Sequence, residues 1–292
     1  MKDVKTAVLG GSGLYDIEGL EDIEEIDIAT PYGKPSDNII CGSLSGVRIA
    51  FLPRHGRGHR ILPTEVNSRA NIYALKSIGV ERIISVSACG SLAEEYAPTD
   101  IVIPDQIFDN TKQRGRNTFF GNGIVAHVAF AKPFCGELSK ILFEAVKETG
   151  AKVHSGGMFV NIEGPRFSTK AESKFYRFMG GNIVGMTAMP EAFLAREAEI
   201  CYATMAHVTD YDVWKEGEEV STEKVIANFN KNIALAKDAI RKIIPKLGER
   251  TCECSSALAN AIMTAPEFIT DSHRKKLGVI AEKYLCPATK EK

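Results

Sequence analysis

Short apolar runs alternate with stretches of helical periodicity along most of the chain. Runs rich in Val and Ile predict buried strands, whereas apolar residues that recur every three or four positions predict amphipathic helices. The predicted strands are 4–9, 38–44, 47–52, 82–87, 100–107, 153–162, 182–185 and 200–208, and the predicted helices are 63–79, 137–150, 169–179, 190–199 and 221–246. This alternation predicts an α/β fold, a single-domain three-layer sandwich with a central mixed sheet.

Neither an internal repeat nor a linker divides the 292 residues, so we expect one domain over 1–292, with 247–292 as a helical extension that carries Cys252-Glu253-Cys254. The chain has 36 Lys and Arg against 37 Asp and Glu, a balance that does not favour nucleic acid or an acidic membrane as a partner. No apolar run approaches the roughly 20 residues that span a bilayer, and the N-terminus lacks the apolar core of a signal peptide. We therefore expect a soluble, cytoplasmic protein.

Two carboxylates follow the apolar run 200–208, in Thr209-Asp210-Tyr211-Asp212-Val213-Trp214. In an extended chain, residues two apart point to the same side, so Asp210 and Asp212 are expected to converge on one small object. Asp residues after a strand are also common turn formers and helix caps, and this alternative stays open from the hexapeptide alone.

Two other strand ends carry the residues of an anion site. The first strand ends in Gly10-Gly11-Ser12-Gly13, where backbone N–H groups and a hydroxyl can approach an anion, although a plain tight turn is the alternative. Another strand ends in Pro53-Arg54-His55-Gly56-Arg57-Gly58-His59-Arg60. Arg matches phosphate with two donors and His adds a switchable one, whereas the alternative is a solvated basic loop. Ligands of open α/β sheets bind beyond the carboxyl ends of strands, which favours the functional interpretation.

The seven cysteines form neither a CxxC pair nor a Cys/His array of zinc-finger spacing, so the sequence predicts no metal site. Most are expected to be small buried apolar residues. Disulfides are unusual in an ordinary cytosol but occur in the intracellular proteins of hyperthermophiles.

Six motifs in order resemble the trimeric purine nucleoside phosphorylase family, and most closely its branch that acts on 5′-methylthioadenosine. They are Gly10-Gly11-Ser12-Gly13, Arg54-His55-Gly56-Arg57, Ala88-Cys89-Gly90-Ser91-Leu92, Ile162-Glu163-Gly164-Pro165-Arg166-Phe167, Met186-Thr187 with Pro190-Glu191, and Thr209-Asp210-Tyr211-Asp212. The resemblance covers residues from about 4 to 246. It implies a nucleoside phosphorylase fold and phosphorolysis of 5′-methylthioadenosine to adenine and 5-methylthioribose-1-phosphate, in methionine and purine salvage. It implies no cofactor, with inorganic phosphate as co-substrate, and small molecules as the binding partners.

The resemblance also implies roles for individual residues. Phosphate contacts would fall on Ser12, Arg54, His55, Ser87, Ala88 and Thr187, with Ser at two positions where relatives often carry Thr. The catalytic residues would be Asp210 and Asp212. The substrate would further contact Phe167 on the purine, Met186 along the ribose, Ser168, Tyr211, Thr222, Val225 and Ile226, and His127 from a neighbouring subunit. The oligomer implied is a trimer or a dimer of trimers.

The residue type at position 210 indicates which purine base is the leaving group. Two adjacent carboxyls tend to share one proton, so a protonated Asp210 can donate to purine N7 while carboxylate oxygens accept from a 6-amino group. Asn there would suit a 6-oxopurine, so Asp favours adenine over hypoxanthine and guanine. Thr222 stands where the branch often has an aliphatic residue, which leaves adenosine open as a further substrate. A broader or 6-oxopurine phosphorylase and a catalytically silent nucleoside-binding protein are the alternatives.

The cysteines gain candidate pairings only from the resemblance, since thermophilic members of the branch carry similar CxC tails. These pairings are Cys135 with Cys201, and Cys252 with Cys254. The alternative is that all seven cysteines are free thiols.

Overall fold

A computed structural model describes residues 4–11, 13–14, 16–112, 117–217 and 222–285. In this part of the chain eleven strands form one mixed sheet. The strands are β1 (Thr6–Gly10), β2 (Leu20–Ile26), β3 (Ile39–Leu44), β4 (Val47–Pro53), β5 (Arg82–Ser91), β6 (Ile101–Ile103), β7 (Gln106–Asp109), β8 (Val153–Ser155), β9 (Met158–Asn161), β10 (Ile183–Gly185) and β11 (Cys201–Asp210). The helices are α1 (Ser68–Ser77), α2 (Gly136–Lys147), α3 (Lys170–Phe178), α4 (Ala188–Glu197), α5 (Thr222–Ile243), α6 (Asp271–Leu277) and α7 (Glu282–Leu285).

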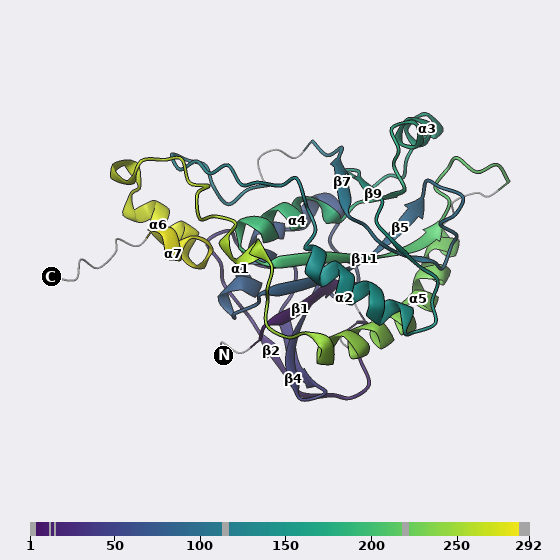
Figure 1. Cartoon of the computed structure of the whole chain (residues 1–292), viewed down its shortest axis with the longest axis horizontal. Coiled ribbons are helices and arrows are strands. Elements are labelled where there is room, and N and C mark those ends of the chain that lie inside the picture. The colour runs from purple at the N-terminus through teal and green to yellow at the C-terminus, as the bar shows by residue number, and fades with distance from the viewer. Residues whose placement is uncertain (1–3, 12, 15, 113–116, 218–221, 286–292) are drawn as a thin grey trace.

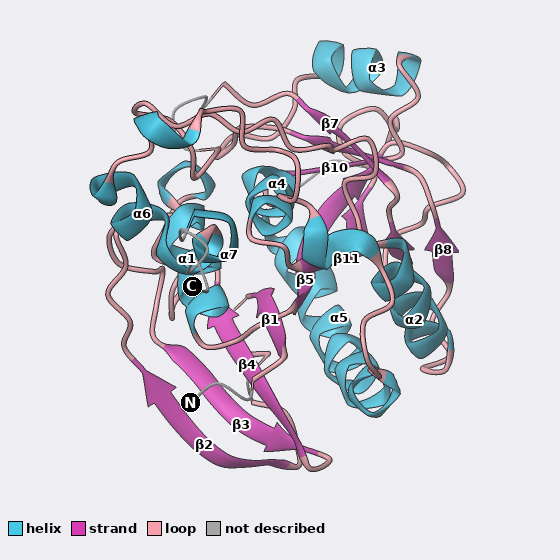
Figure 2. Cartoon of the chain, turned by 60° about the vertical axis from the view of Figure 1, so that its left-hand side comes forward, coloured by secondary structure: helices cyan, strands magenta, loops and turns pink. Residues whose placement is uncertain are grey.

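Two helical layers cover the sheet, because each presents an apolar stripe to one of its faces. Buried residues of α1 and α4 share a core with the last helices of the chain, and buried residues of α2 and α5 form a second core on the opposite face. Figure 2 shows α1, α4, α6 and α7 on one side of the strands and α2 with α5 on the other. The predicted three-layer α/β sandwich with a central mixed sheet is confirmed.

Strand β5 is the centre of the sheet. Its first residues pair in parallel with β1 and β11, whereas Gly90 and Ser91 pair antiparallel with β10. The sheet therefore divides at this strand, with β4, β3 and β2 beyond β1 and with β9 and β7 beyond β10. The residues that follow β5, β10 and β11 are thereby brought to one region of the molecule.

Two predicted strands are each divided in the structure. The run 100–107 breaks at Pro104 into β6 and β7, which pair with different neighbours. The run 153–162 breaks at Gly156 and Gly157, both at positive φ, into β8 and β9. Strand β2 was not predicted, because it is an exposed acidic edge strand without a clear apolar pattern. Among the described residues, no helix has the length and apolar character needed to cross a membrane.

Candidate active site

The parallel strands β1, β4, β5 and β11 bring four sequence motifs to one edge of the sheet. Gly10 ends β1, Arg54 directly follows β4, Ala88 lies in β5 and Asp210 ends β11. The registers place Gly10 beside Pro53 and Asp210 beside Gly90. The sheet thus gathers the motifs that the sequence placed at separate strand ends.

Asp210 and Asp212 converge, although not through an extended chain. Strand β11 ends at Asp210, and Asp212 adopts a left-handed φ of 51°. The Asp212 backbone N–H donates to Asp210 Oδ1 at 2.7 Å, which closes a tight turn of the kind that Asp favours. Alternation along a strand was therefore the wrong reason for the predicted convergence. Asp210 thus forms a turn, which was the alternative to a functional role, and its carboxyl still lies close to Asp212.

The surroundings of Asp210 favour its protonated form. Burial raises the pKa of this carboxyl, and the charge of Asp212 adds to the effect, against the hydrogen bonds from Thr209 and the Asp212 N–H. Thr209 Oγ1 lies 2.7 Å from Asp210 Oδ2 and 3.2 Å from the carbonyl oxygen of Cys89. A hydroxyl has one hydrogen, so Thr209 can donate to only one of these two oxygens at a time.

Asp212 is the more buried member of the pair. It is 4% exposed, and its Oδ2 has no hydrogen-bond partner among the described residues. Burial raises the pKa of Asp212, while the nearby hydroxyls of Ser173 and Ser168 oppose that effect. The Ser168 and Ser173 hydroxyls are themselves buried without a hydrogen bond in this part of the structure. The site therefore holds an acceptor that a ligand can use.

Close packing holds the carboxyl pair in place. A Cβ on Gly90 would lie 3.0 Å from Asp210 Oδ1 and 3.3 Å from Asp212 Cβ, so any larger residue would push the carboxyl pair aside by a few tenths of an ångström. Trp214 Nε1 donates to the Ser91 carbonyl oxygen at 2.7 Å, and Arg177 lies over the indole ring. The sequence hexapeptide is thus fixed against the end of β5.

The other residues predicted to face the purine differ in how exposed their side chains are. Phe167 is 46% exposed, just before α3, where a base can stack on it. Tyr211 is buried, with its ring edge-on to Trp214 and under Lys215 Nζ at 3.7 Å. Its described side-chain contacts are thus with protein.

Two hydroxyls of the predicted phosphate site are buried and have no hydrogen-bond partner among the described residues. They are Ser87 Oγ in β5 and Thr187 Oγ1 at the N-terminus of α4. Gly185 brings the end of β10 against the Ala88 carbonyl oxygen, where an added Cβ would lie 3.4 Å away. Ser87 is adjacent to Ala88 in β5 and Thr187 lies two residues beyond Gly185, so both hydroxyls lie near this point of the sheet. The backbone of Met189 is not helical, so regular α4 begins only after it. Ser12 lies outside the described residues.

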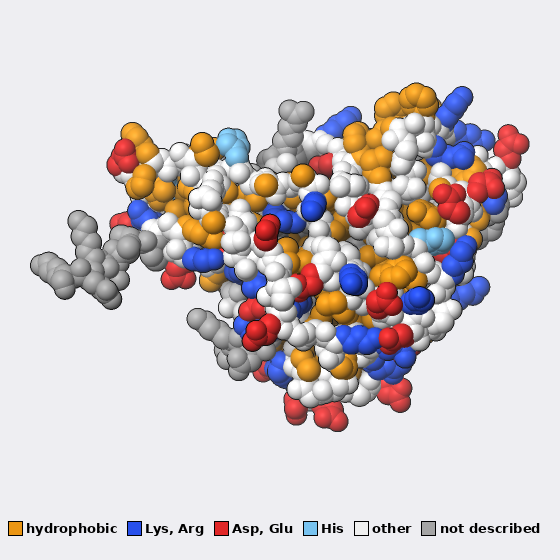
Figure 3. Space-filling model, in the orientation of Figure 1, with side chains coloured by type: hydrophobic (Ala, Val, Ile, Leu, Met, Phe, Trp, Pro, Cys, Tyr) orange, Lys and Arg blue, Asp and Glu red, His pale blue; other side chains and the backbone are white. Residues whose placement is uncertain are grey.

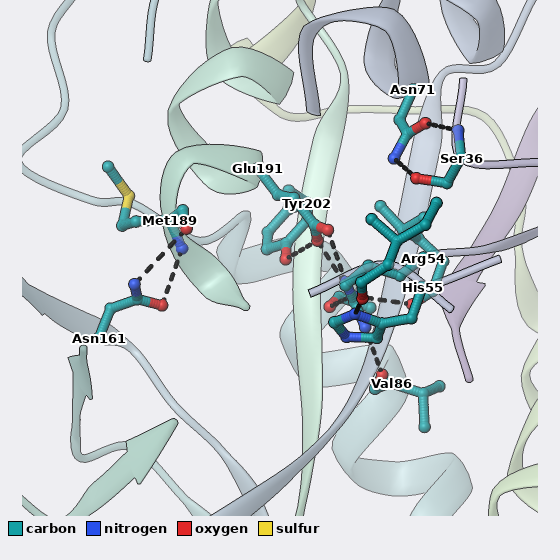
Figure 4. A network of polar contacts seen from close by, with 12 residues as sticks. Ser36, Arg54, His55, Asn71, Val86, Asn161, Met189, Glu191 and Tyr202 are labelled. Carbon is teal, nitrogen blue, oxygen red and sulfur yellow. Dashed lines mark hydrogen bonds and ion pairs between the residues drawn. The ribbon is translucent and has the colours of Figure 1, made fainter. Parts of the chain in front are cut away.

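Arg54 forms a fully buried ion pair that was not predicted. Its Nε lies 2.6 Å and its Nη2 3.0 Å from the two oxygens of Glu191, and Tyr202 also donates to this carboxylate at 2.9 Å. Figure 4 shows Glu191 and Tyr202 directed at the guanidinium. Within the described structure Nη1 makes one hydrogen bond, to the Val86 carbonyl oxygen, which leaves one of its two N–H groups without a partner there. The signal for this pair was a glutamate on the apolar side of a helix, after Pro190.

His55 is neutral rather than a switchable cation. Burial lowers its pKa to about 4, and the charge of Arg54 adds to the effect. Its Nδ1 lies 2.9 Å from the Ile61 carbonyl oxygen and therefore carries the proton. The expected switch near neutral pH is corrected: His55 presents an unprotonated Nε2, an acceptor.

The predicted ribose and 5′ contacts are only partly described. Met186 lines a narrow cleft between residues 63–69 and 186–190, and its Sδ packs against Gly164. Thr222 and Val225 lie in the first turn of α5, and their side chains are outside the described set. Ile226 is exposed.

His127 lies away from the carboxyl pair of its own chain. Its backbone N–H donates to the Ala261 carbonyl oxygen at 2.8 Å, so it belongs to the C-terminal end of the molecule. Figure 1 shows α6 and α7 at the end opposite to α3. The structure therefore does not bring His127 to the Asp210 site within one chain.

The fold and this site define a family. Residues 5–245 match the model of the phosphorylase superfamily, and the chain belongs to this family. It is similar to the S-methyl-5′-thioadenosine phosphorylase of Geobacter sulfurreducens, with 54% identity over 280 residues, 95% of this chain and 98% of the relative. The enzyme of that name from Hyperthermus butylicus is 52% identical over 88% of this chain and 95% of its own.

Solved structures agree with the curated relatives. A methylthioadenosine phosphorylase from an antarctic soil metagenomic library superposes with a TM-score of 0.92 at 46% identity, covering 96% of this chain and 99% of its own. The methylthioadenosine phosphorylase of Schistosoma mansoni, in complex with adenine, has a TM-score of 0.82 at 38% identity, covering 88% and 96%. These findings confirm the resemblance drawn from the six motifs.

Proposed function

We propose that the chain catalyses phosphorolysis of 5′-methylthioadenosine, releasing adenine and 5-methylthioribose-1-phosphate. The observation that carries the proposal is the buried pair Asp210 and Asp212, whose pKa values burial raises, beside strand β5, which also carries the unpartnered hydroxyl of Ser87. The names of the relatives at about half identity support the same substrate.

The phosphate half of the reaction falls to the residues around Ala88. The hydroxyls of Ser87 and Thr187 and the free N–H of Arg54 hold the phosphate. Neutral His55 accepts a hydrogen bond from a hydrogen phosphate through Nε2. A phosphate oxygen attacks the anomeric carbon while its negative charge stabilises the positive charge that develops on the ribose.

The base half of the reaction falls to Asp210 and Asp212. The C1′–N9 bond breaks, its electron pair passes to the purine, and the proton of Asp210 moves to N7. Asp212 Oδ2, which lacks a partner, accepts from the 6-amino group of adenine. Ala88, beside the proposed phosphate residues, and Gly90, against the carboxyl pair, are two residues apart in β5, roughly 7 Å along the strand.

The active form is proposed to be a homo-oligomer in which His127 reaches a neighbour's 5′ pocket. Apolar side chains beside His127 are exposed, with Val125 at 46% and Met263 at 64%, and these two residues are joined by a backbone hydrogen bond. At the opposite end of the molecule, exposed apolar side chains gather over α3, where Phe178 is 87% exposed (Figure 3). Contact between the two ends closes into a ring such as a trimer.

Adenine release from 5′-methylthioadenosine, with and without phosphate, tests the reaction. We expect release only with phosphate, and release without it would make the protein a hydrolase and overturn the proposal. Asp210→Asn should lower kcat/KM about 100- to 10,000-fold, the usual contribution of a general acid. Asp271→Asn, at an exposed site in α6, is the matched control and should leave the rate unchanged.

Comparison of kcat/KM for 5′-methylthioadenosine, adenosine and inosine tests the specificity. A low rate with inosine is expected, because a 6-oxo group offers no donor to Asp212. Equal rates with inosine would contradict the assignment of the base. His127→Ala should raise KM for 5′-methylthioadenosine without changing the KM for phosphate, and a dilution-induced monomer should lose activity.

A further inference from the structure

Four cysteines from three separate segments meet at one point outside the active site. Cys135 precedes α2, Cys201 begins β11, and Cys252 and Cys254 lie at the 3₁₀ turn Glu253–Ser256 of the C-terminal extension. Their four Sγ atoms all lie within 4.8 Å of one another. Cys135, Cys201 and Cys254 are buried, and Cys252 is half-buried.

The three segments are held together by other contacts, so the cluster does not depend on its sulfurs alone. The Cys135 backbone N–H donates to the Tyr202 carbonyl oxygen at 2.8 Å, which joins the start of α2 to β11. The Thr251 backbone N–H donates to Glu137 Oε2 at 3.0 Å, which joins the extension to α2. The backbone therefore presents the four thiols to one another as a preformed set.

The sulfur positions suit a tetrahedral metal ion better than two disulfides. A disulfide requires about 2.05 Å between sulfurs, whereas four thiolates at about 2.3 Å from a central zinc lie roughly 3.8 Å apart. All four are free thiols, and Cys201 Sγ and Cys252 Sγ, at 3.3 Å, belong to different expected pairs. The observed spacing thus surrounds a common centre and does not single out the pairs implied by the resemblance.

One of the four cysteines also lies where a negative charge is stabilised. Cys135 occupies the N-cap of α2, where the helix dipole favours a thiolate, the form that binds metal.

We propose that Cys135, Cys201, Cys252 and Cys254 form a structural zinc site. Zinc prefers four thiolates in tetrahedral geometry, and a site with four protein ligands leaves no open position for catalysis. Binding exchanges thiol protons for Zn²⁺ and needs no oxidant, whereas two disulfides would require the removal of four electrons. The ion ties the C-terminal extension to α2 and β11, and this site departs from the expectation that the chain holds no metal.

The proposal is tested on the whole chain, purified without chelator. Elemental analysis is expected to give one zinc per chain, and alkylation in denaturant without reductant should label all seven cysteines. Cys254→Ser should lose the zinc, whereas Cys41→Ala, at a buried cysteine elsewhere in the core, should retain it. A zinc-free wild-type protein overturns the proposal, whether its mass shows two disulfides or seven free thiols.

A second measurement does not depend on the folding of a variant. Replacement of zinc by Co²⁺ in the wild-type protein should produce the intense thiolate-to-cobalt charge-transfer bands of a tetrahedral sulfur site. Their absence in a protein that binds cobalt stoichiometrically would place the metal elsewhere and refute the assignment. Removal of the metal should lower the thermal midpoint, and re-addition of zinc should restore it.

Discussion

The buried ion pair of Arg54 and Glu191 predicts a large loss of stability for Glu191→Gln. Arg54 is 3% exposed and Glu191 is 1% exposed, and the glutamate accepts two hydrogen bonds from the guanidinium and one from Tyr202. The amide keeps the shape but turns an N–H₂ group toward the guanidinium donors. Arg54 is then left as a buried charge without compensation.

The size of the effect follows from the burial of the charge. Removing one partner of a buried pair costs about 3–5 kcal/mol. For a chain of this size, 1 kcal/mol corresponds to roughly 2–4 °C, so the midpoint should fall by about 6–20 °C. Because Arg54 also loses its fixed orientation, the KM for phosphate should rise.

Differential scanning fluorimetry at one protein concentration and scan rate, with and without phosphate, provides the assay. Phosphate should raise the midpoint less in Glu191→Gln than in the wild type, because weaker binding gives less stabilisation. Glu148→Gln removes a surface partner of Lys246 and should cost at most about 1 kcal/mol. If Glu191→Gln lowers the midpoint no more than Glu148→Gln does, the argument from a buried, dependent ion pair is refuted.

Two further variants test other parts of the structure. Burial raises the pKa of Glu197 to about 7, so its protonated form contributes stability that is complete below about pH 4.5 and is lost as pH rises through 7. Glu197→Gln should remove about 3 kcal/mol of this pH dependence, and an unchanged slope of the free energy of unfolding between pH 5 and 8 would contradict it. Gly90→Ala should displace Asp210 and lower kcat/KM about 100-fold. Gly248→Ala is the control, because an added Cβ there meets nothing within 4 Å, and it should leave kcat/KM unchanged. Equal rates for the two variants would contradict the packing argument.

The sequence predicted most elements because their apolar patterns reflect burial against a sheet. It did not predict where the runs around Pro104 and Gly156 divide, because an apolar run does not identify its pairing partner. Strand β2 was missed since an exposed edge strand needs little apolar surface.

The sequence predicted which residues belong to the candidate site better than it predicted their charge states and partners. Motif order located Asp210, Ser87 and Thr187, all of which lie where a ligand could use them. The neutral state of His55 and the partnership of Arg54 with Glu191 depend on burial and on contacts between distant segments. Neither is visible from residue types and spacing. The sequence did not predict the cluster of four cysteines for the same reason.

In the proposed mechanism, strand β5 lies beside both halves of the reaction, since Ala88 is next to the proposed phosphate residues and Gly90 packs against the carboxyl pair. A central strand paired on both sides keeps that separation fixed, whatever happens in the loops. In the proposed mechanism, the 5′ substituent is recognised by other elements, the start of α5 and a second subunit. Substitutions that change the 5′ group should therefore add independently to substitutions that change the base. The preference for the 5′ group of the substrate can therefore change without a change in the residues that carry the proposed chemistry.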